Sequence, residues 1–305
     1  MVEFSKLIED LAKKKTDIDR EIEEYLKSHF EGELLEMSEY ALKDGKRLRG
    51  IILLLTSECF DGDMEKAYRL AVSAELGHAA SLIHDDIIDK STERRKRPTL
   101  WKKYGIDKAI ILPHILISES LEIARSEGEE FLKIGLETWS KASMGEYLDM
   151  VSIDPRFSEK ILYKKLIELK SGSLFSGAAQ IGILTSKDGK NYQNDAMQYG
   201  NALGISYQIA DDMIDYLNGK SEEGSQYLFT KYMEKELGSK PDIHVLMGFF
   251  IYNIFVEFEK IRKSILIEKS ESLKLFPIFS ILEIMKENGE MYKLVMPVLS
   301  NYFSP

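Results

Sequence analysis

Two clusters of aspartates in this sequence have a spacing that suits metal binding. Both have the pattern Asp-Asp-x-x-Asp, and their members are Asp85, Asp86, Asp89, Asp211, Asp212 and Asp215. On a helix, the first and last aspartates of such a cluster lie on one face, about 6 Å apart along the axis. Magnesium suits them, because it takes few protein carboxylates and completes its shell with water and phosphate oxygens. The repeated pattern therefore favours a magnesium site over two solvated acidic helix ends.

Basic residues follow the first aspartate cluster and also occupy one earlier segment. They are Arg94, Arg95, Lys96 and Arg97 after Asp89, and Lys46, Arg47 and Arg49 before the apolar run 51–55. A positive charge next to a buried segment raises the free energy of the fold unless an anion pairs with it, and a diphosphate would be such an anion. The alternative for the earlier segment is a positively charged helix cap in a solvated turn.

Composition limits the class of protein. Hydrophobic residues make up 44% of the 305 residues, enough for a proper core, and no Pro/Gly/Ser-rich linker divides residues 1–305, so we expect one domain. The net charge of -10 argues against a nucleic-acid partner. The single cysteine, Cys59, excludes an internal disulfide framework and suits a reducing compartment.

The sequence also gives no sign of export or of membrane insertion. Its charged, amphipathic N-terminal stretch lacks the apolar region of a secretion signal. The longest apolar run, 245–256, is interrupted by Asn253 and is too short to span a bilayer. We therefore expect a cytoplasmic protein without a transmembrane segment.

Apolar residues recur at helical spacing along most of the chain. The expected helices include 3–28, 64–89, 106–124 with an interruption at Pro113-His114, 130–150, 161–183 and 196–216. Together they predict an all-α bundle in which the two aspartate clusters face each other across a central cavity. Lys170 lies in mid-pattern of one helix, where a lone lysine is normally a surface residue.

Five segments, taken together, resemble the polyprenyl synthetase family of trans-isoprenyl diphosphate synthases, and in particular those that make geranylgeranyl or longer chains. The segments are GKRLR, HDDIID, RRKRPT, KSGSLF and YQIADDMID, and their order and separation match over roughly residues 40–220. The resemblance implies the isoprenoid synthase fold and a role in isoprenoid biosynthesis. The implied reaction joins isopentenyl diphosphate to an allylic diphosphate, head to tail, in a homodimeric enzyme.

The same resemblance implies roles for individual residues. The six aspartates would hold magnesium, three ions per active site. The residues implied to contact the allylic diphosphate are Arg94, Lys170, Ser171, Gln208 and Lys220, and the first four are the implied catalytic residues. Those implied to hold isopentenyl diphosphate are Lys46, Arg49, His78 and Arg95. His78 precedes Asp85 by seven residues, two helical turns, and so lies on the same face.

Small residues before the first aspartate cluster bear on product length. In the family, the residues four and five before the first aspartate often set it, and here they are Ser81 and Ala80. With Gly77 and Ala74 they form a stripe that extends roughly 16 Å back from Asp85. Such a stripe serves either close helix packing or space for a ligand. We expect the second use and a product of twenty or more carbons, such as geranylgeranyl diphosphate.

Three positions depart from the family pattern. Pro113-His114 replaces Gly-Asp, Trp101 replaces His, and the loop after Asp215 has one extra residue before Gly224 and then Gln226. These departures motivate the alternative of a non-catalytic subunit of a heteromeric synthase, although six clustered carboxylates would serve no purpose there.

A class I terpene cyclase is a further alternative, but Lys46, Arg49 and His78 would then be surplus, because a cyclase needs one diphosphate site. We expect a homodimer, with the helices around 110–124 either at the interface or buried within the monomer.

Overall fold

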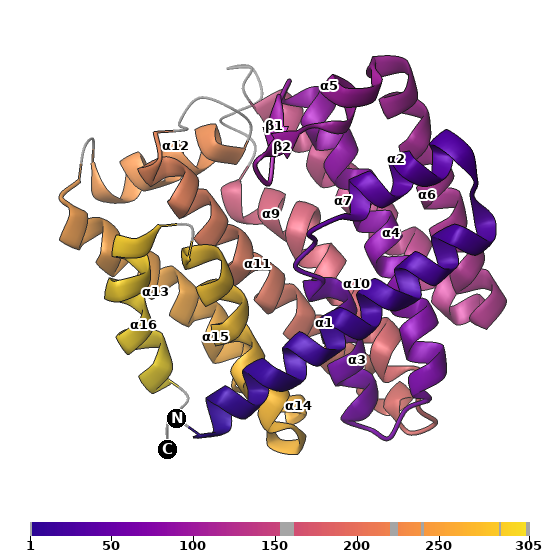
Figure 1. Ribbon diagram of the computed structural model, residues 1–305. Coiled ribbons are helices and arrows are strands. Elements are labelled where there is room, and N and C mark those ends of the chain that lie inside the picture. The colour runs from indigo at the N-terminus through magenta and orange to yellow at the C-terminus, as the bar shows by residue number, and fades with distance from the viewer. Residues whose placement is uncertain (1, 153–161, 220–224, 239–240, 287, 303–305) are drawn as a thin grey trace. The chain divides into compact units, whose positions relative to one another are not determined.

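The computed structural model describes residues 2–152, 162–219, 225–238, 241–286 and 288–302. Within these ranges the chain is helical almost throughout, so the all-α prediction is confirmed (Figure 1). The helices of the first half are α1 (Val2–His29), α2 (Gly32–Leu42), α3 (Leu48–Glu58), α4 (Met64–Ile88), α5 (Leu100–Tyr104), α6 (Ile106–Glu127) and α7 (Glu129–Ser152). Between α4 and α5 lies a short antiparallel hairpin, β1 (Glu93–Arg94) and β2 (Arg97–Pro98).

The second half begins with a helix that changes its winding. α9 (Tyr163–Ile167) passes into a π-helical turn, η1 (Glu168–Gly172), and continues as α10 (Ser173–Ile183). A 3₁₀ turn, η2 (Gly189–Tyr192), precedes α11 (Gln193–Leu217). The last helices are α12 (Ser225–Leu237), α13 (Ile243–Ile261), α14 (Ile265–Lys269), α15 (Glu271–Met285) and α16 (Gly289–Tyr302).

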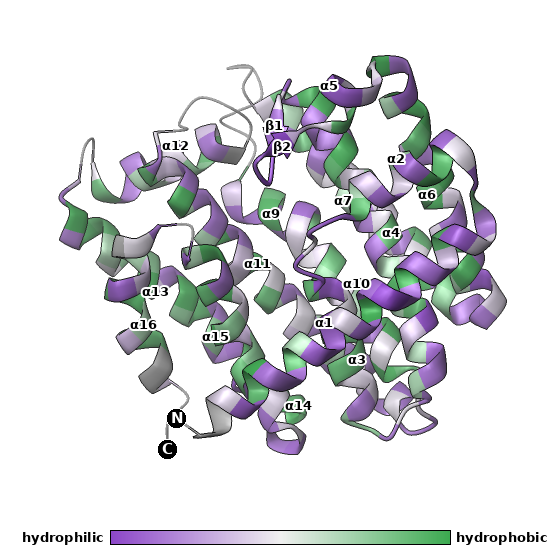
Figure 2. Ribbon diagram, in the orientation of Figure 1, coloured by the Kyte–Doolittle hydropathy of each residue, from purple (hydrophilic) through white to green (hydrophobic). Residues whose placement is uncertain are grey.

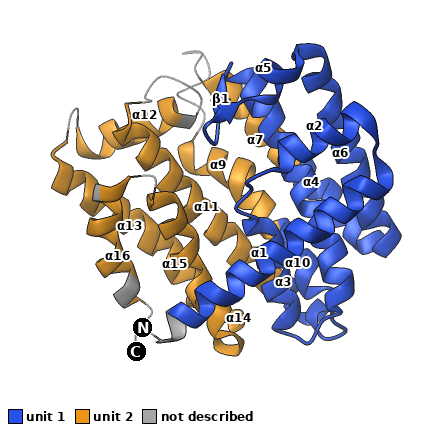
Figure 3. Ribbon diagram, in the orientation of Figure 1, with its two compact units in different colours: residues 1–139, 177–193 blue, residues 140–176, 194–305 orange. Residues whose placement is uncertain are grey.

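Residue contacts group the chain into two compact units, coloured separately in Figure 3. Unit 1 comprises residues 1–139 and 177–193, and unit 2 comprises residues 140–176 and 194–305. The first aspartate cluster belongs to unit 1 and the second to unit 2. The expected cavity between the clusters, and the single domain over 1–305, therefore stay predictions.

In unit 1, α4 packs against α1, α2, α3, α5 and α6. Its N-cap is Asp63, whose carboxylate accepts a hydrogen bond from the Lys66 backbone N–H at 3.1 Å. Against α6 the backbones approach closely, and the Ser73 and Ser120 hydroxyls each donate to the other residue's carbonyl oxygen. These contacts fix the helix that ends in the first aspartate cluster.

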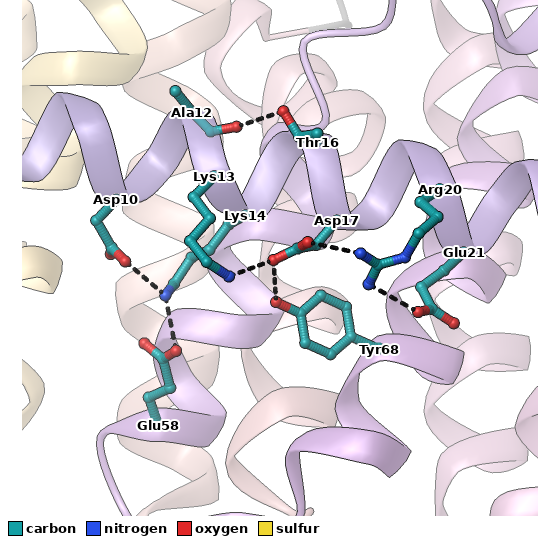
Figure 4. Close-up of polar contacts among 10 residues, drawn as sticks. All are labelled: Asp10, Ala12, Lys13, Lys14, Thr16, Asp17, Arg20, Glu21, Glu58 and Tyr68. Carbon is teal, nitrogen blue, oxygen red and sulfur yellow. Dashed lines mark hydrogen bonds and ion pairs between the residues drawn. The ribbon is translucent and has the colours of Figure 1, made fainter.

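Helix α1 lies on the same unit with its apolar face inward, as its spacing predicts. Leu11, Ile18 and Leu26 are buried, while charged side chains connect the helix to its neighbours (Figure 4). The Lys14 ammonium is 2.7 Å from Glu58 at the end of α3 and 3.0 Å from Asp10. Apolar burial and this ion pair together attach α1 to α3.

In unit 2, long apolar helices form the core. Figure 2 shows apolar residues along α13 and α15, and Phe250, Phe258 and Phe276 are fully buried. The hydroxyl of the buried Tyr199 on α11 donates to the Leu273 carbonyl of α15 at 2.6 Å. α11, which carries the second aspartate cluster, is therefore held by both packing and hydrogen bonding.

Two features of single helices bear on the sequence predictions. The interruption expected at Pro113-His114 is wrong, because α6 continues through Pro113. Pro113 is buried, and the packing of α6 on α4 compensates for the backbone hydrogen bond that a proline cannot donate. Among the described residues, no helix is long and apolar enough to cross a membrane.

Candidate active site

The first aspartate cluster occupies the C-terminal end of α4, where its members have different surroundings. Asp85 is half-buried, and Asp89, whose backbone N–H donates to the Asp85 carbonyl, is exposed at the end of the helix. Asp86 is buried and accepts a hydrogen bond from Arg94 Nε at 2.8 Å. Burial raises the pKa of Asp86, and the Arg94 charge opposes that rise. Asp85 and Asp89 are thus the members of this cluster with accessible oxygens.

The hairpin after α4 places Arg95 on a strained turn. Arg95 and Lys96 connect β1 to β2 with φ angles of 53° and 59°, a left-handed conformation that glycine and asparagine usually supply. Arg95 and Arg97 both donate to the Lys43 carbonyl, at 2.7 and 3.1 Å. These bonds hold the hairpin against the turn that carries Lys46.

Trp101, one of the departures from the family pattern, closes this loop. Its indole N–H donates to the carbonyls of Ser91 at 2.8 Å and Asp86 at 3.1 Å. The side chain therefore satisfies backbone acceptors at the end of α4 and fixes the start of the loop.

The turn between α2 and α3 is organised by Arg47, whose φ is 55°. Its guanidinium donates to Asp19 on α1 at 2.7 Å, to the Leu42 carbonyl, and lies 3.5 Å from the buried Glu75 carboxylate on α4. Arg47 is therefore an internal support, whereas its neighbours Lys46 and Arg49 are half-buried.

His78 lies among the arginines of unit 1. Its pKa is held well below 6.5, first by burial and then by the positive charges of Arg49, Arg95, Arg94 and Arg47. The imidazole is consequently neutral at pH 7 and lies in a strongly positive environment. Of the residues expected to hold isopentenyl diphosphate, the structure thus brings Arg49, His78 and Arg95 into one electrostatic neighbourhood.

The second cluster, on α11, has a buried member at its centre. Asp212 accepts hydrogen bonds from Tyr163 Oη at 2.6 Å and from the amides of Gln208 and Gln226, each at 3.0 Å. Burial is the main cause that raises the pKa of Asp212, to about 7. Asp211 and Asp215 are half-buried. Each cluster therefore combines one buried, hydrogen-bonded carboxylate with two more accessible ones.

The π-helical turn η1 carries Lys170 and Ser171. Lys170 Nζ lies 2.6 Å from Asp149 and 2.8 Å from Glu146, both on α7, so the lysine is held inside unit 2 rather than on its surface. The Ser171 hydroxyl donates to the Gln208 side-chain oxygen, which joins the turn to the second aspartate cluster. The structure thus places Lys170, Ser171 and Gln208 in one part of unit 2, and their role at a diphosphate stays a prediction.

Several polar residues of these clusters carried no functional signal in the sequence. They are Tyr163, Asp149, Glu146 and Glu75, each recognisable only through the residue it contacts in space.

Lys220, expected to contact the allylic diphosphate, lies outside the described residues.

The stripe expected to accommodate the product is partly accessible on α4. Ala74, Gly77 and Ser81 are half-buried, whereas Ala80 has no exposed surface. Gly77 lies beside Ser120 of α6. One use of these small residues is therefore close helix packing, and the product-length pocket stays a prediction.

The magnesium prediction can be tested against the oxygens that the clusters present. Within the described ranges, no three His, Cys, Asp or Glu side chains converge as a ready-made metal site. Magnesium binds in such places through one or two carboxylates per ion, with water and phosphate oxygens completing its shell. The accessible carboxylates of Asp85, Asp89, Asp211 and Asp215 fit that mode of binding.

Comparison with known proteins identifies the family to which the chain belongs. The sequence pattern of the polyprenyl synthetase family matches residues 31–228. The chain belongs to this family. It is a prenyltransferase by that membership, as the resemblance of the five segments implies.

Individual relatives support the assignment. The chain is 36% identical to a hexaprenyl pyrophosphate synthase from Saccharolobus solfataricus, over 76% of this chain and 81% of that protein. It is 37% identical to a geranylfarnesyl diphosphate synthase from Methanosarcina mazei, over 61% of this chain and 62% of the relative. A geranyltranstransferase from Thermotoga maritima shares the fold, with a TM-score of 0.70 at 24% identity over 93% of this chain and 99% of that one.

Proposed function

We propose that the protein catalyses the magnesium-dependent, head-to-tail condensation of isopentenyl diphosphate with an allylic diphosphate. The product is an all-trans polyprenyl diphosphate of twenty or more carbons. The observation that carries the proposal is the pairing, in each unit, of an aspartate cluster with cationic or polar side chains suited to a diphosphate. In unit 1 these surround His78, and in unit 2 they are Lys170, Ser171 and Gln208.

Three magnesium ions would be held by the two aspartate clusters, with Asp85, Asp89, Asp211 and Asp215 offering the accessible oxygens. Magnesium, when bound, neutralises charge on the departing diphosphate, so that the allylic carbon–oxygen bond can ionise. Asp86 and Asp212 are buried and accept hydrogen bonds from Arg94 and Tyr163, and so fix the positions of those two side chains beside the clusters.

The protein's own charged and polar side chains divide between two diphosphates. Arg94, Lys170, Ser171, Gln208 and Lys220 would bind the allylic diphosphate, and Lys46, Arg49, His78 and Arg95 would bind isopentenyl diphosphate. Because His78 is neutral at pH 7, it would donate one hydrogen bond while the arginines supply the charge. No protein nucleophile is needed, but the allylic cation must be kept from water. The small residues Ala74 and Gly77 of α4 would form part of one apolar wall.

We also propose that the enzyme is a cytoplasmic homodimer. Support comes from α6, where Ile106, Ile110 and Ile111 expose 43, 45 and 56% of their surface. Three exposed isoleucines on one helix are an unusual surface for a monomer, and a second copy of α6 would cover them.

The single Cys59 suits the reducing cytoplasm, and the net charge of -10 suits neither nucleic acid nor an anionic membrane as partner.

The function is tested by incubating the purified chain with magnesium, labelled isopentenyl diphosphate and, in separate tubes, dimethylallyl, geranyl and farnesyl diphosphate. Chromatography of the dephosphorylated products should show chains ending at one length of twenty or more carbons. Chelation of magnesium should abolish the products. No incorporation by folded protein would favour a non-catalytic subunit, and a cyclic hydrocarbon would favour a terpene cyclase.

One substitution tests the metal assignment in the same assay. Asp85→Ala should lower kcat by about 10²-fold or more while the far-UV circular dichroism keeps its helical form. Glu24→Ala, which removes an exposed carboxylate on α1 far in the chain from either aspartate cluster, is the control and should retain full activity. Near-normal turnover by the Asp85 variant would remove Asp85 from the metal site.

A further inference from the structure

Two glycines bring helices α7 and α11 of unit 2 close to the backbone of the π-helical turn η1. On α7, a methyl group added to Gly145 would lie 2.7 Å from the Lys170 Cα and 2.9 Å from the Leu169 carbonyl carbon. On α11, a methyl group added to Gly204 would lie 2.7 Å from both the Gly172 Cα and the Ser171 carbonyl oxygen. All of these neighbours are backbone atoms, which cannot move aside as a flexible side chain can.

Each of the two helices contacts the turn a second time through a polar side chain close to its glycine. α7 presents Glu146 and Asp149, directly after Gly145 and one turn beyond it, and both pair with the Lys170 ammonium. α11 presents Gln208, one turn beyond Gly204. The side-chain oxygen of Gln208 accepts a hydrogen bond from the Ser171 hydroxyl. The backbone contact sets the distance of each helix from the turn, and the polar contact then reaches the side chain.

A π-turn inserts one residue into a helix and is kept where the surroundings require it. Here the insertion directs Lys170 toward α7 and Ser171 toward α11, two successive residues serving two different helices. A side chain at either glycine would push its helix away from the turn. At Gly145 the contacts of 2.6 and 2.8 Å at Lys170 would then be lost, and at Gly204 the hydrogen bond between Ser171 and Gln208.

We propose that Gly145 and Gly204 are positioning residues of the prenyl transfer reaction, which hold Lys170 and Ser171 at the allylic diphosphate. The inference rests on the proposed function, because it takes Lys170 and Ser171 as ligands of that diphosphate. It adds that the two glycines, which touch no substrate, determine the geometry of the binding pair. A shift of about 1 Å in such a pair can cost about 10²-fold in rate.

The test compares Gly145→Ala and Gly204→Ala with Gly248→Ala. Gly248 lies on α13 in the same unit, is exposed, and an added methyl group would meet nothing within 4 Å. The Gly145 and Gly204 variants should each lower kcat/KM for the allylic diphosphate by about 10- to 100-fold, with a raised KM for that substrate. The KM for isopentenyl diphosphate should not change, and Gly248→Ala should match the wild type in every constant.

A double-mutant cycle separates positioning from a general loss of structure. In a Lys170→Ala background, Gly145→Ala should cause little further loss, because the residue through which it acts is already absent. The same holds for Gly204→Ala in a Ser171→Ala background. Two results would overturn the proposal. One is that the losses in kcat/KM of the single variants simply multiply in the double variants, and the other is that the KM rises equally for both substrates.

The remaining outcomes are also decisive. An inactive wild type would refute the proposed function, whereas an active wild type with unaffected glycine variants would refute only this inference. If neither glycine variant folds while Gly248→Ala folds normally, the glycines serve stability alone and the inference fails.

Discussion

At the scale of single residues, Ser81 is better placed than Ala80 to limit product length. Ala80 is completely buried, so a larger side chain there would be forced into packed core. Ser81 is half-buried on the face of α4 that carries Asp85, four residues further on. We therefore predict that Ser81→Phe shortens the product by at least one isoprene unit while Ala80→Phe mainly lowers the melting temperature. Chromatography of the dephosphorylated products checks the first effect, and an unchanged product would remove Ser81 from the pocket.

Asp212 predicts a dependence of stability on pH in protein stripped of metal. Its pKa of about 7 in the folded state exceeds the ordinary value of 3.8, so the folded state binds this proton more tightly than the unfolded chain. The stabilisation is complete below pH 3.8 and is lost as pH rises toward about 7. By linkage the loss is of the order of a few kcal/mol.

Asp212→Asn should remove this dependence. In EDTA, the melting temperature of the wild type should fall relative to that of the variant between pH 5 and pH 8. Glu24→Gln, which neutralises an exposed carboxylate on α1, should run parallel to the wild type over the same interval. Parallel curves for the wild type and Asp212→Asn would show that Asp212 titrates normally.

The sequence predicts the two aspartate clusters but not the different burial of their members. The spacing of Asp85, Asp86 and Asp89 needs only helical geometry, which is local. The burial of Asp212 depends on Tyr163, 49 residues away, and on Gln226 beyond the loop. Such partners are determined by tertiary packing, and no spacing in the sequence reveals them.

At the scale of elements, apolar periodicity predicts where most helices lie but not how they wind. The helix expected over 3–28 is α1, and the one expected over 196–216 lies within α11. The segment 161–183 is predicted as one helix, yet it contains the π-turn η1, whose backbone lies in close contact with α7 and α11. Pro113 likewise suggests a break that packing between α4 and α6 prevents.

Two charged contacts within unit 1, those of Lys14 and of Arg47, should differ in their contribution to stability. Lys14 is itself buried, but its partners Asp10 and Glu58 keep 40 and 42% of their side-chain surface exposed. Arg47 contacts Glu75, which is only 2% exposed. Lys14→Met leaves its partners in water and should cost at most about 1 kcal/mol. Arg47→Met leaves a carboxylate buried without its cation and should cost about 3–5 kcal/mol.

Urea unfolding measures this contrast. Lys13→Met, whose lysine is 75% exposed, is the control and should leave the unfolding midpoint almost unchanged. Equal losses for Lys14→Met and Arg47→Met would mean that partner burial does not decide the cost.

At the scale of the whole molecule, the exposed face of α6 predicts the oligomeric state. Burying one isoleucine side chain contributes about 1.5–3 kcal/mol, so a dimer that covers Ile106, Ile110 and Ile111 gains a substantial part of its stability there. Light scattering should give the wild type a mass of about 70 kDa, twice the 35.0 kDa of one chain. Ile110→Glu would place an unpaired carboxylate in that contact, and its desolvation should shift the mass toward the single chain. Ile243→Glu, on α13 with the same 43% exposure as Ile106, is the control and should remain dimeric. A wild-type mass of one chain at every concentration tested would instead mean that α6 keeps its isoleucines exposed to water, and the homodimer would be excluded.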